Sequence, residues 1–336
     1  MTNVAINGMG RIGRAVLKIV LDTPELELVG INDLLAPDHL AYLLTYDSVY
    51  GRYEKKVEAN EDRLIIDGQA YRMCNEEDPE QLPWGDLKVD LVFECTGVFL
   101  DKEGMEKHLK AGANRVILSA PAKSEEVDMV VHCINPSESP PQIISCASCT
   151  TNCITPVVEI LGRRIGFKKA VMTTIHAYTS SQAIVDGPRK KWRRGRAGAA
   201  NFVPTSTGAA KATTQVLPQY KGKFDGVAVR GPVPVGSLVD IVFVLEEPTT
   251  EDDVNAVFRE EAESDRYRGV FGVTEDPIVS SDIIKDPRAS VVDLNMTQVV
   301  DGDLLKVMSW YDNEWGYSAQ MVREAVRMVT ECGSQG

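Results

Sequence analysis

The sequence has no long apolar run: no hydrophobic stretch approaches the roughly 20 residues that a membrane-spanning helix needs. Its start also has no basic segment followed by an apolar one, because Thr2–Asn7 already reads as a strand, so no secretory signal is visible. We therefore expect a cytoplasmic protein. The 43% hydrophobic and 25% charged residues are typical of a folded globular protein and exclude a disordered one.

Cysteine and histidine are both scarce. The seven cysteines are irregularly spaced and only Cys149 and Cys153 lie close together, which indicates reduced thiols rather than a disulfide framework or a zinc site, and we expect no metal. A catalytic base has few candidates, because the four histidines are His39, His108, His132 and His176. His39 and His108 fall in helical patterns that we expect to be exposed.

Positive charge is in deficit, with 36 Lys and Arg residues against 49 Asp and Glu residues and a net charge of −13. This balance argues against general nucleic-acid binding. At 336 residues the chain exceeds the size at which one hydrophobic core usually stops growing, so we expect two domains.

A glycine-rich turn near the start of the chain predicts a dinucleotide site. The run Val4–Asn7 reads as a strand, and Gly8, Gly10 and Gly13 then precede a helical pattern. In such a turn the first glycine allows the bend, the second lets a pyrophosphate approach the backbone, and the third lets the helix pack on the strand. An ordinary strand–helix corner would also explain three glycines. A second strand, however, ends at Asp33, where a carboxylate can bond the adenosine ribose and favour NAD.

Further strands are predicted over Tyr71–Met73, Leu91–Phe93 and Val116–Leu118. In an open parallel sheet, ligands bind beyond the carboxyl ends of the strands. Turn residues that follow the last two strands are therefore candidate cofactor contacts, although ordinary turn chemistry would also place them there. These candidates are Thr96, Gly97, Ser119 and Ala120.

The chemistry depends on Cys149. The segment Gln142–Cys146 reads as a strand, and apolar residues recur at helical spacing from Ile154 onwards, so Cys149 lies at or just before a helix N-terminus. There, free backbone N–H groups and the helix dipole favour a thiolate and can hold an oxyanion. The alternative is a small buried hydrophobic residue, which is the usual role of a free cysteine and suits Cys153 better.

His176 is the candidate base. A predicted strand over Ala170–Ile175 ends directly before it, in the same domain as Cys149, which suits a general base and oxyanion donor. A histidine at a strand end can also be structural. Its pairing with a helix-start cysteine in a dinucleotide enzyme favours the catalytic role.

A loop over residues 177–201 carries the basic run Arg189–Arg196, which includes one tryptophan. Nucleic-acid binding is one interpretation. A site for a phosphorylated substrate is the other, and Pro204–Lys211, a second helix start with hydroxyls and free N–H groups, favours it. For Arg189 and Lys190 a third interpretation stays open, in which they are ordinary solvated surface residues.

The second half predicts a different sheet. The strand-like segments are Gly226–Arg230, Leu238–Leu245, Ser290–Gln298 and Leu304–Tyr311. They are too closely spaced for helical crossovers throughout, so the sheet should be largely antiparallel. The predicted fold is α/β: a Rossmann-type doubly wound parallel sheet in residues 1–148, completed by a C-terminal helix over 313–336, and an α+β catalytic domain over 149–312.

Five segments of the chain, 5–14, 147–153, 174–179, 206–211 and 310–317, closely resemble phosphorylating glyceraldehyde-3-phosphate dehydrogenases. The resemblance covers essentially the whole chain. The cysteine segment and the terminal Trp-Tyr-Asp-Asn-Glu-Trp-Gly-Tyr motif are more specific than the glycine turn.

The resemblance implies that Cys149 is the nucleophile and His176 the base in the NAD-dependent oxidation of glyceraldehyde 3-phosphate with inorganic phosphate. It also implies a homotetramer in which the basic loop packs near the subunit centre. The implied cofactor contacts are Asn7, Arg11, Ile12, Asp33, Ser119, Asn313 and Tyr317. The implied anion subsites comprise Ser148, Thr150, Thr179, Arg194, Thr207, Gly208 and Arg230.

Three departures from the family pattern stand out: Met9 in place of Phe, Ser181 in place of an acidic residue or Asn, and the segment Gly231–Gly236. Erythrose-4-phosphate dehydrogenase, a close relative, is the enzymatic alternative. The intact segment Thr207–Ala210 favours an enzyme that uses inorganic phosphate. The non-enzymatic alternative is an RNA-binding or scaffold protein that acts through the basic loop.

Overall fold

A computed structural model of the chain describes residues 1–137 and 140–333. Contacts divide the chain into two compact units. The first comprises residues 1–132, 136–147 and the chain from Met321 on, and the second comprises residues 133–135 and 148–320. The sequence-based domain ranges differ from this grouping near residue 148 and in where the C-terminal helix divides, and they stay a prediction.

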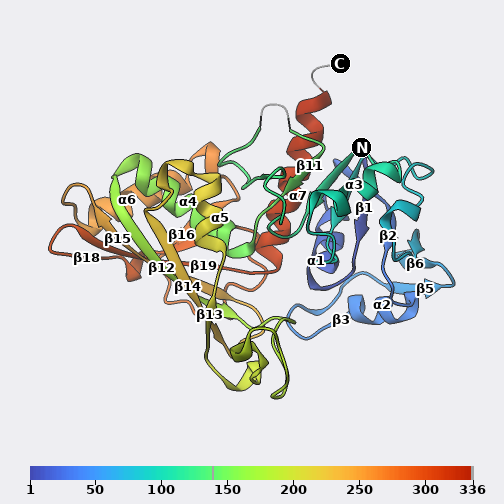
Figure 1. The fold of residues 1–336 in the computed structure, drawn as a ribbon, viewed down its shortest axis with the longest axis horizontal. Coiled ribbons are helices and arrows are strands. Elements are labelled where there is room, and N and C mark those ends of the chain that lie inside the picture. The colour runs from blue at the N-terminus through green and yellow to red at the C-terminus, as the bar shows by residue number, and fades with distance from the viewer. Residues whose placement is uncertain (138–139, 334–336) are drawn as a thin grey trace. The chain divides into compact units, whose positions relative to one another are not determined.

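The first unit contains a nine-stranded sheet in the order β10-β11-β9-β8-β1-β2-β7-β6-β5 (Figure 1). All neighbours are parallel except β5 with β6 and β6 with β7. The strands are β1 Thr2–Asn7, β2 Leu26–Asn32, β5 Val57–Asn60, β6 Arg63–Ile66, β7 Gln69–Cys74, β8 Leu91–Glu94, β9 Arg115–Leu118, β10 Asp128–Met129 and β11 Ile143–Ser145. The helices are α1 Arg11–Val20, α2 Pro37–Thr45 and α3 Lys102–Lys110, and β3 Tyr46–Asp47 pairs with β4 Gly51–Arg52.

Strand β1 determines where a ligand can bind in this unit. It pairs with β2 on one side and with β8 on the other, so the chain changes direction across the sheet at β1. The crevice beyond the carboxyl ends of the strands at such a switch point is the usual ligand site of open parallel sheets. The predicted Rossmann-type sheet is confirmed.

The second unit contains an eight-stranded sheet in the order β13-β14-β12-β15-β19-β17-β16, with β18 paired to β19. Only β12 with β14 and β16 with β17 are parallel, so the predicted, largely antiparallel sheet is confirmed. The strands are β12 Phe167–Ala177, β13 Val203–Ser206, β14 Phe224–Gly231, β15 Ser237–Leu245, β16 Phe271–Thr274, β17 Ser290–Asp293, β18 Gln298–Val300 and β19 Leu304–Tyr311. The helices are α4 Cys149–Arg164, α5 Ala209–Val216, α6 Glu251–Ala262 and α7 Trp315–Gly333, of which α7 continues into the first unit.

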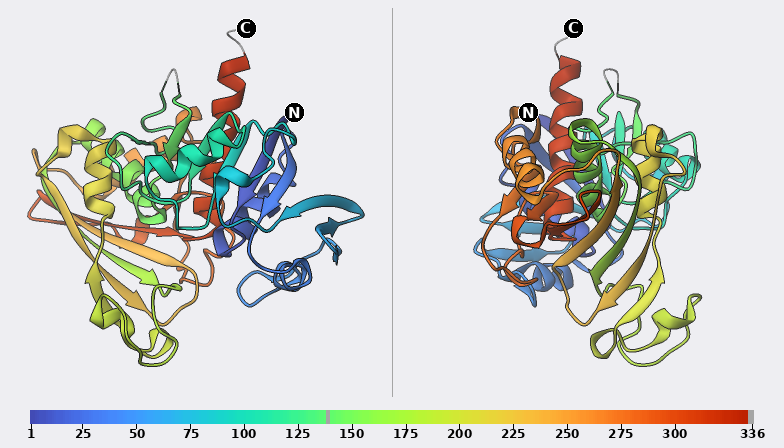
Figure 2. Two further views of the ribbon diagram at one scale, coloured as in Figure 1. Left: turned by 45° about the vertical axis from the view of Figure 1, so that its right-hand side comes forward. Right: turned by 90° about the vertical axis from the view of Figure 1, so that its left-hand side faces the viewer.

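Two features of the second unit differ from the prediction. The single strand expected over Ser290–Gln298 is wrong: β17 ends at Asp293, whose carboxylate accepts a bond from Asn295 N, and a 3₁₀ turn separates it from β18. The edge strand β13 was not predicted. Its Pro204 is tolerated because β13 pairs with β14 alone, so no second neighbour needs the missing N–H. The segment between β12 and β13 extends away from the sheet of this unit (Figure 2).

His108 contradicts the expectation of exposure, whereas His39 is exposed as predicted. The His108 side chain is fully buried, with Nδ1 accepting a bond from Trp84 Nε1 at 3.0 Å and Nε2 lying 3.0 Å from Glu94 Oε2. A buried histidine is tolerated when its ring nitrogens have hydrogen-bond partners. A polar residue in a helical pattern is therefore not always exposed to solvent.

In the described part of the chain, no helix combines the length and the apolar character needed to cross a membrane. Nor do the His, Cys, Asp and Glu side chains of residues 1–137 and 140–333 include a group of three or more that could hold a metal ion.

Candidate functional site

Cys149 is the first residue of α4, as the sequence predicts. Ser148 caps the helix: its Oγ accepts a bond from Thr151 N at 3.1 Å and lies 2.8 Å from Thr151 Oγ1. Ala147, directly before the cap, has a positive φ of 58°, which turns the chain sharply into the helix. Cys149 as a residue is partly exposed, so a substrate can reach it while the first turn of α4 holds it.

His176 lies beside the thiol. Its Nε2 is 3.4 Å from Cys149 Sγ, and its side chain is 5% exposed. Strand β12 places it opposite Arg230 of β14, and Arg230 Nη1 lies 2.9 Å from both His176 Nδ1 and Ala177 O. His176 Nδ1 is 2.7 Å from the same carbonyl. A carbonyl oxygen only accepts, so the short contact assigns the proton to Nδ1, and Arg230 Nη1 donates to the same carbonyl rather than to Nδ1. Nε2 then has a free lone pair that faces the sulfur.

The electrostatics favour a neutral pair before substrate arrives. Burial, with Arg230 adding to it, lowers the pKa of His176 from 6.5 to about 3. Burial also raises the pKa of the Cys149 thiol, while Arg230, the Thr150 hydroxyl and two backbone N–H groups at the helix start act in the opposite direction. Burial thus disfavours the thiolate and the imidazolium alike, so it favours a thiol beside a neutral imidazole, in contrast to the thiolate that the helix start alone predicts. This is a donor and acceptor pair ready for proton transfer.

Cys153 has a different environment. It is fully buried one helical turn later, and its Sγ lies 3.8 Å from both Ser290 Oγ and Ser309 O. Burial raises the pKa of this thiol to about 12, so it is inert at neutral pH. The interpretation of Cys153 as a packing residue is confirmed.

Tyr311 belongs to this site and was missed from the sequence. Its Oη lies 2.9 Å from Thr150 Oγ1 and 2.9 Å from Thr174 Oγ1, so it links the start of α4 to β12. Its ring meets the His176 imidazole edge-on, with centroids 5.9 Å apart. The specific terminal motif contains Tyr311, and that motif was the signal that could have identified it.

Two arginines give the site positive charge. Arg194 Nε donates to Thr205 Oγ1 and its Nη1 donates to Ser181 Oγ, each at 3.2 Å, while Ser181 Oγ is 2.8 Å from Thr179 Oγ1. Within residues 1–137 and 140–333, neither Arg194 nor Arg230 pairs with a carboxylate. Burial lowers the pKa of Arg230, and the charge of Arg194 adds to this effect. Two uncompensated guanidinium groups beside a nucleophile favour an anionic ligand.

The other predicted anion-binding residues lie at helix starts. Thr207 Oγ1 accepts a bond from Ala209 N at 3.2 Å, and Gly208 caps α5 without a side-chain bond. The Ser148 hydroxyl caps α4, and the Thr150 hydroxyl bonds Tyr311. The structure thus links Thr179 to Arg194 through the Ser181 hydroxyl, and it places Ser148 and Thr150 together at the start of α4.

A cavity of about 450 Å³ lies at the carboxyl ends of β1, β2 and β8. Gly8 has a φ of 91°, and a Cβ there would lie 2.6 Å from Thr96 N. A Cβ at Gly13 would lie 1.9 Å from Gly8 O, whereas one at Gly10 would have nothing within 4 Å. The first and third glycines therefore serve turn and packing, and the second leaves open space where a pyrophosphate fits. Asp33 lines the cavity, and its carboxylate accepts bonds from Met9 N and Leu35 N.

The cavity contains only some of the predicted cofactor contacts. Its lining comprises Asn7, Gly8, Gly10, Asn32, Asp33, Leu34, Glu76, Glu77, Cys95, Thr96, Val98 and Phe99. Outside that lining are Arg11, Ile12, Gly13, Gly97, Ser119 and Ala120, and Asn313 and Tyr317 lie in the second unit. Arg11 instead pairs with Asp47 at 2.8 Å, and Ser145 Oγ donates to Ala120 O at 2.7 Å. Asn313 Oδ1 accepts bonds from Gly236 N and Ser237 Oγ.

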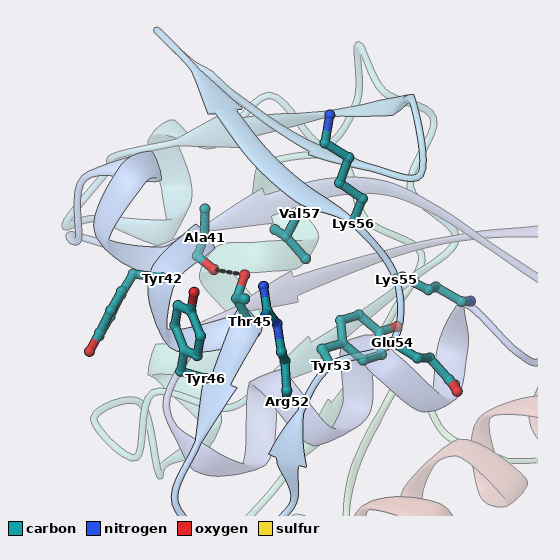
Figure 3. A pocket seen from close by; sticks show the side chains of 10 residues that line it. All are labelled: Ala41, Tyr42, Thr45, Tyr46, Arg52, Tyr53, Glu54, Lys55, Lys56 and Val57. Carbon is teal, nitrogen blue, oxygen red and sulfur yellow. Dashed lines mark hydrogen bonds between the residues drawn. The ribbon is translucent and has the colours of Figure 1, made fainter.

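A second cavity of the first unit, about 510 Å³, is bordered by α2, the β3–β4 hairpin and β5 (Figure 3). The Arg52 guanidinium lies 5.4 Å from the centre of the Tyr46 ring, and Thr45 Oγ1 donates to Ala41 O at 2.8 Å. Its lining has tyrosines and basic side chains but no cysteine or histidine, so it contains no nucleophile–base pair.

Comparison with known proteins identifies the family. Residues 2–102 match the family model described as glyceraldehyde 3-phosphate dehydrogenase, NAD binding domain, and residues 148–313 match the model of the C-terminal domain. NAD is therefore the cofactor.

Three relatives bear the name glyceraldehyde-3-phosphate dehydrogenase. The protein of Streptomyces coelicolor is 46% identical, over 95% of this chain and 96% of its own. That of Haloarcula vallismortis is 47% identical and that of Geobacillus stearothermophilus 45%, each over 98% of both chains. The chain belongs to the glyceraldehyde-3-phosphate dehydrogenase family.

Proposed function

We propose that this protein oxidises D-glyceraldehyde 3-phosphate with NAD and inorganic phosphate to 1,3-bisphosphoglycerate, through a thioester on Cys149. The observation that carries this proposal is the 3.4 Å separation of Cys149 Sγ and His176 Nε2. Two arginines without carboxylate partners among the described residues lie in the same unit. A nucleophile, a base and sites for two anions are the groups that this reaction needs.

The chain's residues act in a defined order. Cys149 Sγ attacks the aldehyde carbon while its proton passes to His176 Nε2, which returns it to the new alkoxide. The N–H groups at the start of α4 stabilise the developing negative charge. His176 then takes the hydroxyl proton of the hemithioacetal as the C–H bond breaks. Bound NAD supplies the hydride acceptor for this oxidation.

Phosphate completes the reaction. His176 first releases to solvent the proton that it took from the hemithioacetal. A phosphate oxygen then attacks the thioester carbon and the carbon–sulfur bond breaks, while the departing Cys149 sulfur takes up the proton of the attacking hydrogen phosphate. The anionic groups of the aldehyde and of inorganic phosphate would be held by Arg194, Arg230, Thr179, Thr207, Gly208, Ser148 and Thr150. The cofactor would be held by Asn7, Gly8, Gly10, Arg11, Ile12, Gly13 and Asp33. Its further contacts would be Thr96, Gly97, Ser119, Ala120, Asn313 and Tyr317.

The test measures NADH formation with glyceraldehyde 3-phosphate and erythrose 4-phosphate side by side, each with and without inorganic phosphate. We expect fast, phosphate-dependent oxidation of the first aldehyde. Faster turnover of erythrose 4-phosphate, or turnover independent of phosphate, would overturn the proposal. The family models and the relatives' names do not favour an erythrose-4-phosphate dehydrogenase or a purely RNA-binding scaffold.

The two arginines allow the anion subsites to be separated. We expect Arg230→Ala mainly to raise the KM for the phosphorylated aldehyde, and Arg194→Ala mainly to raise the KM for inorganic phosphate. Charge-assisted hydrogen bonds contribute about 1.5 to 3 kcal/mol each, so each change should be roughly ten- to a hundredfold. Initial rates over a matrix of both substrates measure this. Equal effects of both variants on both KM values would contradict the assignment of one arginine to each anion.

Asp33 allows a prediction about cofactor choice. Its carboxylate lines the cavity, and the 2′-phosphate of NADP would bring like charge close to it. We expect kcat/KM to favour NAD by at least about a hundredfold, or ~2.7 kcal/mol. Asp33→Gly should shrink this ratio, mainly by weakening NAD. A wild-type ratio within tenfold of unity in steady-state kinetics would show that Asp33 does not face the ribose.

We also propose a homotetramer in the cytoplasm. The loop between β12 and β13 exposes large apolar side chains, with Ile184 91%, Trp192 90% and Phe202 73% exposed. Apolar groups gathered on one loop favour burial against another subunit. Sedimentation analysis would test the homotetramer, and a monomer at micromolar concentration would contradict it.

A further inference from the structure

A buried chain of hydrogen bonds leads from the interior of the first unit to the cofactor cavity. Trp84, Glu94 and His108 are fully buried, and Asn7 and Asn32 are at most 4% exposed. The mechanism above uses neither Glu94 nor His108. A buried carboxylate without a cation is costly unless several donors satisfy it, so this arrangement needs a reason.

The hydrogen-bond donors determine which atoms carry the protons along this chain of hydrogen bonds. An indole N–H can only donate, so His108 Nδ1 must accept from Trp84 Nε1 at 3.0 Å. His108 Nε2 therefore carries the proton and donates to Glu94 Oε2, also at 3.0 Å. His108 is neutral in this arrangement, and Glu94 only accepts.

Glu94 in turn holds two residues that line the cavity. Asn7 Nδ2 donates to Glu94 Oε2 at 2.6 Å. Thr96 donates to Glu94 Oε1 twice, from its N at 2.8 Å and from its hydroxyl. Together with His108, these give the carboxylate four donors.

The bond to Glu94 also fixes which way the Asn7 amide faces. With Nδ2 on Glu94, Asn7 Oδ1 accepts from Asn32 Nδ2 at 2.7 Å. Asn32 is joined to Glu76 by two further bonds of 2.9 Å, Nδ2 to Glu76 O and Glu76 N to Oδ1. The orientation of four lining residues, Asn7, Asn32, Glu76 and Thr96, thus depends on one carboxylate that the cavity lining does not include.

We propose that Glu94, oriented by His108 and Trp84, is a positioning residue for the cofactor: it holds Asn7 and Thr96 in the arrangement that binds the dinucleotide. This inference rests on the proposed cofactor site. Glu94 acts on cofactor affinity and not on the chemistry of Cys149, which belongs to the second unit.

A purely electrostatic effect of Glu94 and a positioning role predict opposite changes in NAD affinity when Glu94 is neutralised. The cofactor carries negative phosphates, so neutralising a nearby carboxylate would tighten binding if charge alone mattered. Glu94→Gln keeps the shape but replaces one oxygen with an NH₂ group, which faces either the two Thr96 donors or those of Asn7 and His108. His108 cannot change its tautomer to relieve this, because Trp84 still donates to Nδ1. Positioning therefore predicts weaker binding.

The experiment measures the Kd for NAD by isothermal titration calorimetry on the whole protein. For Glu94→Gln we expect Kd to rise about tenfold or more, and kcat at saturating NAD to stay within threefold of wild type. A partly unfolded sample would lower the number of sites and not their affinity, so the two effects are separable. Trp84→Phe removes the outermost donor and should raise Kd by a smaller factor.

Glu324→Gln is the matched control. Glu324 is also a fully buried carboxylate of the first unit beside a histidine, His132, at 2.9 Å, but it does not line the cavity. Its loss should lower the unfolding temperature and leave the Kd for NAD within twofold. If Glu94→Gln does not fold, Trp84→Phe, which removes a donor to His108 and does not change the cavity lining, replaces it in the test and should raise Kd.

Each outcome is decisive. Unchanged or tighter NAD binding in the Glu94 variant, or in Trp84→Phe if that variant replaces it, overturns the inference. Equal weakening in Glu324→Gln also overturns it, because the effect would then be general destabilisation. Failure of the wild-type protein to bind NAD would instead overturn the proposed cofactor site.

Discussion

Replacing Cys149 with serine is expected to lower kcat by at least about a thousandfold, since loss of a covalent nucleophile removes the central step of such a mechanism. Serine fits the first turn of α4, and its hydroxyl has a much higher pKa than a thiol, so His176 cannot activate it to the same degree. NAD should still bind, because Cys149 does not line the cofactor cavity. Rapid-quench experiments with radiolabelled aldehyde would detect no acyl-enzyme.

Cys153→Ser is the control for this variant. Cys153 is fully buried and its thiol has a pKa of about 12, so the change should affect stability more than turnover. Iodoacetamide at neutral pH should label Cys149 first. The assignment of the nucleophile is wrong if Cys149→Ser retains more than a few per cent of wild-type turnover, or if Cys153 is labelled preferentially.

His176→Asn is expected to lower kcat by about a hundred- to ten-thousandfold, the range typical of a lost general base. Its remaining activity should rise with pH, because hydroxide can then remove the thiol proton whose pKa burial has raised. A pH–rate profile measures this, with His39→Asn, at an exposed position, as control. Retention of a tenth of wild-type kcat at neutral pH would exclude His176 as the base.

The same variant has a second readout in stability. Because the pKa of His176 falls from 6.5 to about 3 on folding, the unfolded chain binds more protons between these values. The contribution of the neutral His176 to the free energy of unfolding is therefore complete above pH 6.5, and it is lost as pH falls through about 3. His176→Asn should therefore flatten the fall in unfolding free energy across this window.

The parts of the fold that the sequence predicted are those with local signals. The turn from β1 to α1 needs glycines at fixed spacing, and α4 shows helical periodicity from Ile154 onwards. Asp33 was predicted to close the second strand, and it directly follows β2. Each of these features depends on residues that are near one another in the chain.

The errors come from features that depend on distant partners. His108 was expected to be exposed because its helix is polar, and only Trp84 and Glu94, 24 and 14 positions away, make its burial possible. Tyr311 reaches Thr150 from 161 positions away, so the terminal motif that contains it could mark it as a candidate but not show which residues it contacts. The break between β17 and β18 follows from the side chain of Asp293, which bonds the turn instead of continuing the strand.

Tyr311 has a consequence for the energetics of turnover. One hydroxyl joins the helix that carries the nucleophile to the strand that carries the base. The loss of motional freedom needed to align sulfur and imidazole therefore occurs once, when the chain folds, and is not repeated in every cycle. Only the aldehyde has to be immobilised before the carbon–sulfur bond forms. The barrier to that step should accordingly be mainly enthalpic, with a small activation entropy once the substrate is bound.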